Sequence, residues 1–99
     1  MAYNRDRLVK IADGAGQPSL WSYKTEDAAA TVDTAAYFNE DGSPLKLGDI
    51  IIRTTVTNID ASNEAVSTQG FHTVNSVTRG NPDVIDVADT LAITQTDTD

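Results

Sequence analysis

The fold depends on the stretch Ser19–Ile52, which has the sequence SLWSYKTEDAAATVDTAAYFNEDGSPLKLGDIII. It contains the only tryptophan of the chain, two of its three tyrosines and one of its two phenylalanines. It also contains the clearest helical pattern and the longest aliphatic run. We expect the residues before it to form an arm and the residues after it to form strands that pack against it.

The beginning of this stretch predicts a strand over residues 19–25. Trp21 and Tyr23 alternate with Ser22 and Lys24, the period-2 pattern of a half-buried strand. The face with the two aromatic side chains is predicted to lie in the core or in a protein interface. Their polar tips then need a hydrogen-bond partner or water.

A helix is predicted near residues 26–38, capped by Thr25 or Asp27 because their side-chain oxygens can accept a free backbone N–H. Its apolar stripe is mostly alanine, so it depends on packing against the rest of the domain. Thr31 and Asp33 can divide it into two short turns. The glycine and proline in residues 39–44 end it.

The second half of the chain predicts further strands. Residues 50–57 (IIIRTTVT) are apolar on both faces at first, as in a central strand. Shorter strands are predicted over residues 65–67, 70–77 and 83–87, with a weaker candidate over 88–93 and a polar tail over 94–99.

The first 18 residues predict either an N-terminal arm that is ordered only against another molecule, or an edge strand. Residues 1–10 carry a net charge of +2, whereas the remaining chain carries −10. A basic arm on an acidic body can dock on an acidic neighbour or on another copy. The alternative is a solubilising acidic surface with incidental bases. The candidate oligomer or capsid interface residues are Arg5, Arg7, Leu8, Val9, Ile11, Trp21 and Tyr23.

Length and composition favour one small, mainly β domain (α+β). Of the 99 residues, 28 are Thr, Val or Ile, the β-branched types that favour strands. We therefore expect a compact β-barrel or sandwich-like domain over residues 19–93, with one short helix and an extended arm. No apolar run is long enough to span a membrane and no signal peptide is visible, so synthesis in the cytoplasm is expected.

The net charge of −8 argues against a nucleic-acid partner, because an acidic body repels phosphate backbones. The chain lacks cysteine, so a disulfide framework and Cys-based zinc sites are excluded. The only histidine, His72, lies in a strand pattern without a nucleophile elbow, which argues against a catalytic triad.

Two acidic segments of the sequence are compared with known metal-binding patterns. Residues 39–43 alternate oxygen-bearing side chains as calcium loops do, but the twelfth position is Ile50 instead of an acid. Asp83, Asp86 and Asp89 are spaced by three, which in a strand places neighbours on opposite faces. We predict no catalytic, cofactor or metal site and no small-molecule substrate.

The motif S-L-W-S-Y-K-T-x-D-A-x-A-T-V-x-x-A-x-Y-F-N over Ser19–Asn39, followed by Leu45-Lys46-Leu47-Gly48-Asp49-Ile50-Ile51, resembles a pattern of small tailed-bacteriophage virion proteins. The resemblance covers about a third of the chain. A glycine that is common before the Tyr-Phe pair of this pattern is Ala36 here.

The resemblance implies a non-enzymatic virion protein on the outer capsid surface. It would be a decoration (cement) protein, or the capsid-anchoring part of a head fibre or spike. The implied partners are the major capsid protein and further copies of the chain, and we expect a trimer. The alternative is a host-surface or carbohydrate-binding module of a tail fibre, with Trp21, Tyr23, Tyr37 and Phe71 as the platform. An enzyme with His72 is a third hypothesis.

Overall fold

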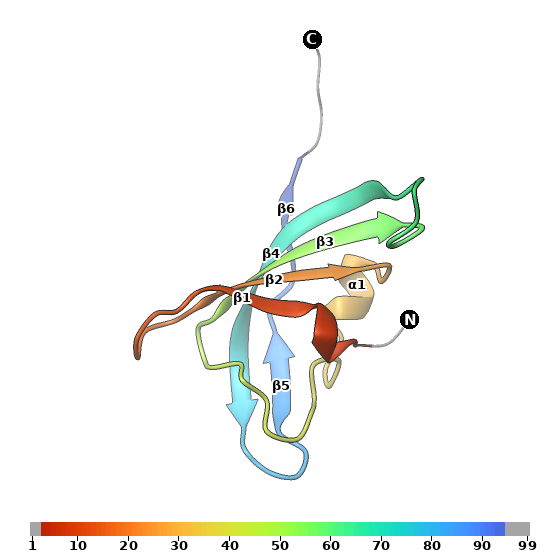
Figure 1. Ribbon diagram of the computed structural model, residues 1–99. Coiled ribbons are helices and arrows are strands. Elements are labelled where there is room, and N and C mark those ends of the chain that lie inside the picture. The colour runs from red at the N-terminus through yellow and green to blue at the C-terminus, as the bar shows by residue number, and fades with distance from the viewer. Residues whose placement is uncertain (1–2, 95–99) are drawn as a thin grey trace.

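The computed structural model describes residues 3–94, which form a six-stranded sheet with one short helix (Figure 1). The elements are η1 (Arg5–Arg7), β1 (Leu8–Ala12), β2 (Leu20–Thr25), α1 (Ala29–Val32), β3 (Ile50–Thr57), β4 (Ala65–Thr78), β5 (Val84–Val87) and β6 (Leu91–Ile93). The predicted mainly β fold with one short helix is confirmed. Because the strand pairings run from β1 to β5 without closing on themselves, the compact β domain is built on one open sheet rather than on a closed barrel or two stacked sheets.

The strand order is β1-β2-β3-β4-β5, with β6 also paired to β4. β2 and β3 are parallel, whereas every other pair is antiparallel. A parallel pair needs a crossover, and the segment between β2 and β3 supplies it together with α1. This crossover covers one face of the sheet and leaves the other face open.

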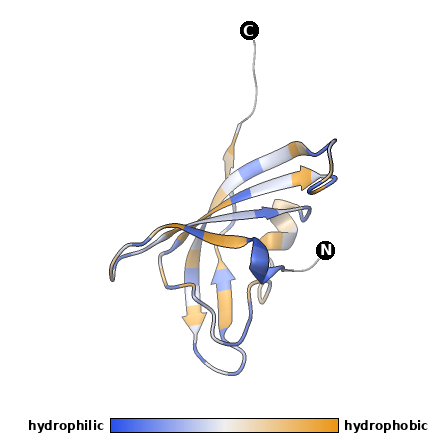
Figure 2. Cartoon of the chain, viewed as in Figure 1, coloured by the Kyte–Doolittle hydropathy of each residue, from blue (hydrophilic) through white to orange (hydrophobic). Residues whose placement is uncertain are grey.

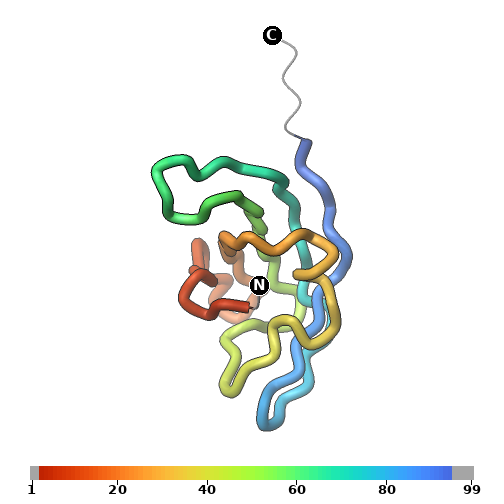
Figure 3. The backbone as a smooth tube through the Cα atoms, turned by 90° about the vertical axis from the view of Figure 1, so that its right-hand side faces the viewer, coloured from red at the N-terminus to blue at the C-terminus, as the bar shows by residue number. Residues whose placement is uncertain are grey.

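The 14-residue strand β4 organises the second half of the domain. Residues 69–71 of this strand lie between β3 and β6, and its last part pairs with β5 beyond Ile50, the first residue of β3. Figure 3 shows β5 and β6 following one another along the same edge of β4. Residues 65–67 and 70–77, predicted as two strands, therefore belong to one strand that continues through Gln69 and Gly70.

The core lies between the sheet and the crossover. The strands contribute alternate side chains, and the crossover contributes apolar residues from α1 and the following loop; the buried cluster is Leu8, Trp21, Tyr23, Val32, Phe38, Leu45, Ile51, Val74, Ile85 and Val87. Tyr3, Tyr23, Tyr37 and Phe38 pack as an aromatic group with ring centroids 4.9–6.2 Å apart. The Trp21–Tyr23 face is therefore core.

The helix is shorter than the 26–38 segment predicted. Only Ala29–Val32 is helical, and its N-cap, Ala28, makes no side-chain capping bond. The predicted cap residues act elsewhere, since the Thr25 hydroxyl accepts the Asp27 N–H at 3.0 Å. The chain then continues in turns, and Ala36 adopts a left-handed φ of 75°, which no helix can accommodate.

The predicted free arm is incorrect for the described residues 3–18, where the edge-strand alternative holds. β1 pairs with β2, Leu8 is buried in the core, and Tyr3 packs on the aromatic group. In Figure 2, β1 forms an apolar stretch beside the hydrophilic η1. Met1, Ala2 and tail residues 95–99 lie outside the described part of the chain. No helix within residues 3–94 is long and apolar enough to cross a membrane.

Candidate functional site

Asp49 joins the two halves of the motif on which the family resemblance rests. Its carboxylate is fully buried and accepts three hydrogen bonds: from the Ser19 N–H (2.9 Å), the Trp21 indole Nε1–H (2.9 Å) and the Lys46 N–H (3.0 Å). The Ile50 N–H also donates to the Ser19 carbonyl at 3.0 Å. The Ser-Leu-Trp and Gly-Asp segments thus hold the start of β2 against the start of β3, which is a structural role.

The tyrosine hydroxyls of the core are used within the fold. Tyr37 donates to the Asp27 carboxylate at 2.6 Å and lies 2.8 Å from the Tyr23 hydroxyl, which accepts the Asn4 N–H at 3.1 Å. Burial, followed by the hydrogen bond to Asp27, raises the pKa of Tyr37 above its usual value. With Trp21 and Tyr23 also buried, most of the proposed sugar platform faces inward.

The open face of the sheet carries an apolar surface. Paired residues place Val9, Ser22, Ile52, Phe71 and Leu91 in one row across five strands. Residues directly opposite in paired strands share a face, so this row lies on the side away from the core.

A shallow depression of about 380 Å³ lies on this face. We call its lining the outer patch, which consists of Leu20, Ile50, Ile52, Phe71, Thr73 and Leu91. Leu91 is 68% exposed and Ile50 39%. Val9 and Ile11, both more than half exposed, extend the apolar surface onto the edge strand β1. Five of the six lining residues are aliphatic or aromatic, and none is charged, which is typical of a docking surface.

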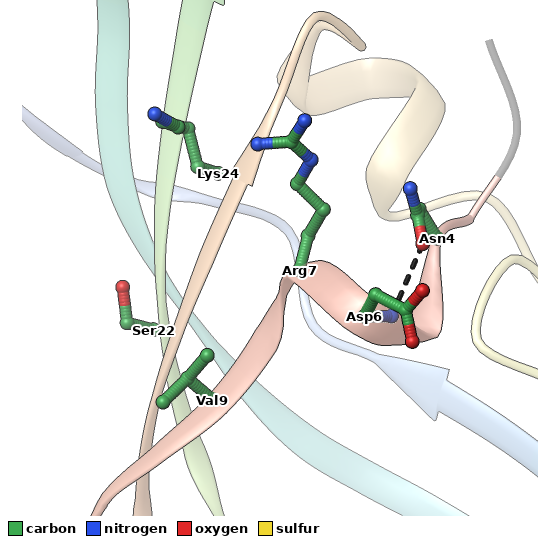
Figure 4. A pocket seen from close by; sticks show the side chains of 6 residues that line it. All are labelled: Asn4, Asp6, Arg7, Val9, Ser22 and Lys24. Atoms are coloured by element: carbon green, nitrogen blue, oxygen red, sulfur yellow. Dashed lines mark hydrogen bonds between the residues drawn. The ribbon is translucent and has the colours of Figure 1, made fainter. Parts of the chain in front are cut away.

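The two basic side chains in the hollow beside β1 are paired with acids of the same domain. A hollow of about 520 Å³ is lined by Arg7, Lys24, Val9, Ser22, Asn4 and Asp6 (Figure 4). Arg7 forms an ion pair with Asp60, and Lys24 pairs with Asp60 (3.3 Å) and Glu64 (3.1 Å). The hydrogen bond from Arg7 is the largest cause that lowers the pKa of Asp60 to about 2.

Of the predicted interface residues, only some have an exposed side chain that is free to contact another molecule. Val9 and Ile11 are exposed, whereas Leu8, Trp21 and Tyr23 are core residues. Arg5 donates to the Leu8 carbonyl and lies 3.5 Å from Glu40, so both predicted arginines have acidic partners in the same chain.

The outer patch was not predicted from the sequence. The only signal was the run of isoleucines that starts β3, which is apolar on both faces.

His72 is held by both ring nitrogens. Its Nε2 accepts the Arg53 Nε–H at 3.1 Å, and its Nδ1 lies 2.9 Å from the Ala88 carbonyl, so Nδ1 carries the hydrogen. Burial lowers the pKa of the imidazole, and the nearby guanidinium acts in the same direction. This arrangement suits a neutral structural histidine.

The side chains of the two segments considered for metal binding form hydrogen bonds that hold loops in place. Asn39 accepts the Ile85 N–H at 2.9 Å. Asp83 accepts the N–H groups of Gly80 and Ser43 and pairs with Arg79 at 3.0 Å. These hydrogen bonds, that from Gly80 first, lower the pKa of Asp83. Within the described residues, no cluster of three or more His or acidic side chains could hold a metal ion.

Comparison of the chain with protein-family models, with curated proteins and with solved structures gives no match. The function is therefore inferred from the geometry of the domain and from the motif resemblance. The exposed outer patch is a feature that the packing of the domain does not account for.

Proposed function

We propose that this chain is a non-enzymatic structural protein of a tailed-bacteriophage virion, made in the host cytoplasm and mounted on the outer capsid surface. It would act as a decoration protein or as the capsid-anchoring part of a head fibre. The observation that carries the proposal is the outer patch, a contiguous apolar area on a sheet face that the crossover leaves uncovered. The motif residues agree with it, because Asp49, Trp21 and Ser19 are used in the scaffold that joins β2 to β3.

The occupant we propose for the outer patch is a second copy of this chain. Each copy carries a net charge of −8, which disfavours self-association through most of the surface. The patch itself contains no charged side chain, so two copies can meet there without bringing like charges together. In a trimer the outer patches of three copies would converge on the threefold axis and be buried together there.

The expected affinity of this contact is low. Full burial of a Leu or Ile side chain contributes about 1.5–3 kcal/mol, and the patch residues are already partly buried, so each adds roughly 1 kcal/mol. With Leu20, Ile50, Ile52, Phe71 and Leu91 on each copy, the sum is comparable to the roughly 4–15 kcal/mol that association costs. The contact then becomes stable where copies are held close together, as on a capsid lattice. We propose a trimer on threefold capsid positions, where each copy also contacts the major capsid protein.

The carbohydrate-binding alternative has less support. Two of its four platform residues, Trp21 and Tyr23, are buried, and Tyr37 hydrogen-bonds inside the core. Phe71 faces the open side, but it belongs to the outer patch.

The test uses two leucines of nearly equal exposure. Leu91, 68% exposed, lies in the outer patch, whereas Leu47, 66% exposed, lies outside it. Leu91→Asp and Leu47→Asp are compared with the unchanged chain by light scattering over a concentration series. The same three proteins are then tested for co-sedimentation with phage heads that lack this protein.

We expect the unchanged chain and Leu47→Asp to self-associate only at the highest concentrations of the series, and Leu91→Asp to remain a monomer throughout. Leu91→Asp should also bind the heads at least about tenfold more weakly, while Leu47→Asp binds them as the unchanged chain does. Equal behaviour of the two variants would remove the outer patch from the proposal. Absence of head binding by the unchanged chain would contradict the capsid role. Deletion of residues 1–18 is unsuitable, because it removes Leu8 and Tyr3 from the core.

A further inference from the structure

Arg53 is a cation enclosed by the fold. It lies near the middle of β3 on the core side and is 1% exposed. Its Nε donates to His72, Nη1 donates to the hydroxyls of Thr55 and Thr68, and Nη2 makes one long bond of 3.4 Å to the Thr90 hydroxyl. Neutral groups thus provide all of its hydrogen bonds within the described chain.

No acid within residues 3–94 forms an ion pair with Arg53. The charge of Asp33 acts on the guanidinium from a distance, but burial outweighs it and lowers the pKa of Arg53. Buried charges in proteins are normally paired as well as hydrogen-bonded, because desolvation is costly. An anion bound next to the guanidinium would supply this pairing.

The guanidinium also has donor capacity left. An arginine side chain has five N–H groups, and the four bonds above leave one hydrogen of Nη2 without an acceptor in the described residues. Gly70 keeps this region open. A Cβ at position 70 would lie 2.0 Å from the Thr90 hydroxyl and 3.0 Å from Nη2.

Arg53 lines a hollow of about 430 Å³ between α1 and β6. The walls combine small apolar side chains, including Ala28, Ala29, Ala30 and Ala92, with the hydroxyls of Thr68 and Thr90. The latter two residues are also hydrogen-bond partners of Nη1 and Nη2. A ligand entering the hollow would therefore meet methyl groups on its sides and the guanidinium with its two flanking hydroxyls.

We propose that this hollow binds a carboxylate carried on a short apolar stem. A planar guanidinium matches the two oxygens of a carboxylate, and the bond to an ionised acceptor is stronger than the bonds to hydroxyls. The methyl walls suit an aliphatic stem of a few carbons. A single cation in mainly apolar walls favours a monoanion over a phosphate dianion. The carboxylate can come from a free short-chain acid or from a glutamate side chain of another polypeptide.

This site is separate from the outer patch, because Arg53 and Ile52 are neighbours in β3 and face opposite sides of the sheet. The inference therefore stands or fails independently of the proposed capsid role.

The experiment is an NMR titration of the full chain at constant ionic strength, observing the Arg53 Nε–H and the backbone amides of Ala29 and Thr68. The probes are butyrate, its neutral counterpart butyramide, and the capped peptide acetyl-Ala-Glu-Ala-amide. We expect saturable shifts at these positions with butyrate or with the peptide, and none with butyramide. Binding by only one of the two carboxylates identifies the source.

Two variants test the assignment to this hollow. Arg53→Met removes the cation, and Ala92→Leu fills the hollow while leaving every Arg53 bond in place; Ala61→Leu, in the exposed β3–β4 turn, is the matched control. We expect Ala92→Leu to weaken binding at least about tenfold, or about 1.4 kcal/mol, relative to Ala61→Leu. Arg53→Met, where it folds, should abolish binding. Unchanged binding in Ala92→Leu, equal shifts with butyramide, or no saturable shift with either carboxylate would overturn the proposal.

Discussion

Replacement of Asp49 is the sharpest test of how the fold is held together. Each hydrogen bond to an ionised group contributes roughly 1.5–3 kcal/mol, and Asp49 accepts three from Ser19, Trp21 and Lys46. Because the three bonds share one carboxylate, their effects are not additive. Asp49→Ala leaves buried N–H groups without an acceptor, so we expect a loss of about 3–5 kcal/mol. That is a large part of the 5–15 kcal/mol typical of folded domains.

Asp49→Asn separates charge and geometry. The amide oxygen can keep one set of bonds, but the NH₂ group then faces N–H donors, so we expect a loss of about 1–3 kcal/mol. Asp89→Ala, at an exposed position between β5 and β6, makes the same charge change and serves as the control. Its expected effect is within about 0.5 kcal/mol of zero.

The assay is urea unfolding followed by far-ultraviolet circular dichroism and by Trp21 fluorescence. Coincident transitions allow the free energy of unfolding to be compared among the four proteins. Surface substitutions usually change the free energy of unfolding by less than about 0.5 kcal/mol. If the values for Asp49→Ala and Asp89→Ala differ by no more than this amount, the role assigned to Asp49 is wrong.

Three further predictions concern backbone, burial and pH. Ala36→Gly should stabilise the domain by about 0.5–1 kcal/mol, because Ala36 has a φ of 75°, whereas Ala35→Gly should destabilise it; chemical denaturation of both checks this. Gly70→Ala should lower the free energy of unfolding by about 1–3 kcal/mol, because the added methyl group crowds the Thr90 hydroxyl. Gly80→Ala is the control: the nearest atom to its added methyl group lies at 3.4 Å, so chemical denaturation should show a loss below about 1 kcal/mol, as for most surface substitutions. Burial lowers the pKa of His72, so near pH 6.5 the imidazole takes up a proton in the unfolded chain but not in the folded one. The folded state is therefore less stable at acidic pH, and the urea concentration at the unfolding midpoint should be lower at pH 5.5 than at pH 7.5. An unchanged midpoint would contradict a buried neutral imidazole.

Local pattern was enough to locate most strands. The alternation over residues 19–25, the β-branched run over 50–57 and the short segment over 83–87 correspond to β2, β3 and β5 within one residue at either end. Alternation also placed Trp21 and Tyr23 on one face, because strand side chains point to opposite sides in turn. These properties depend only on neighbours along the chain.

Local pattern failed where distant residues decide the outcome. The helix predicted over 26–38 ends at Val32, and the alanine stripe could not reveal the left-handed Ala36 or the use of Thr25 and Asp27 in other bonds. The N-terminal segment looked unpartnered because the loop to its partner β2, residues 13–19, is longer than a typical hairpin turn.

The sequence by itself determined a small, mainly β domain and which residues of each strand share a face, since both follow from residue type and the two-residue period. Only the tertiary structure decided which face is covered. The parallel pairing of β2 with β3 places the crossover on the side of Ile51 and Arg53, which encloses the guanidinium. Ile50 is left exposed and Ile52 half-buried on the other side. That choice arises from contacts between segments far apart in the chain, and both proposed binding surfaces follow from it.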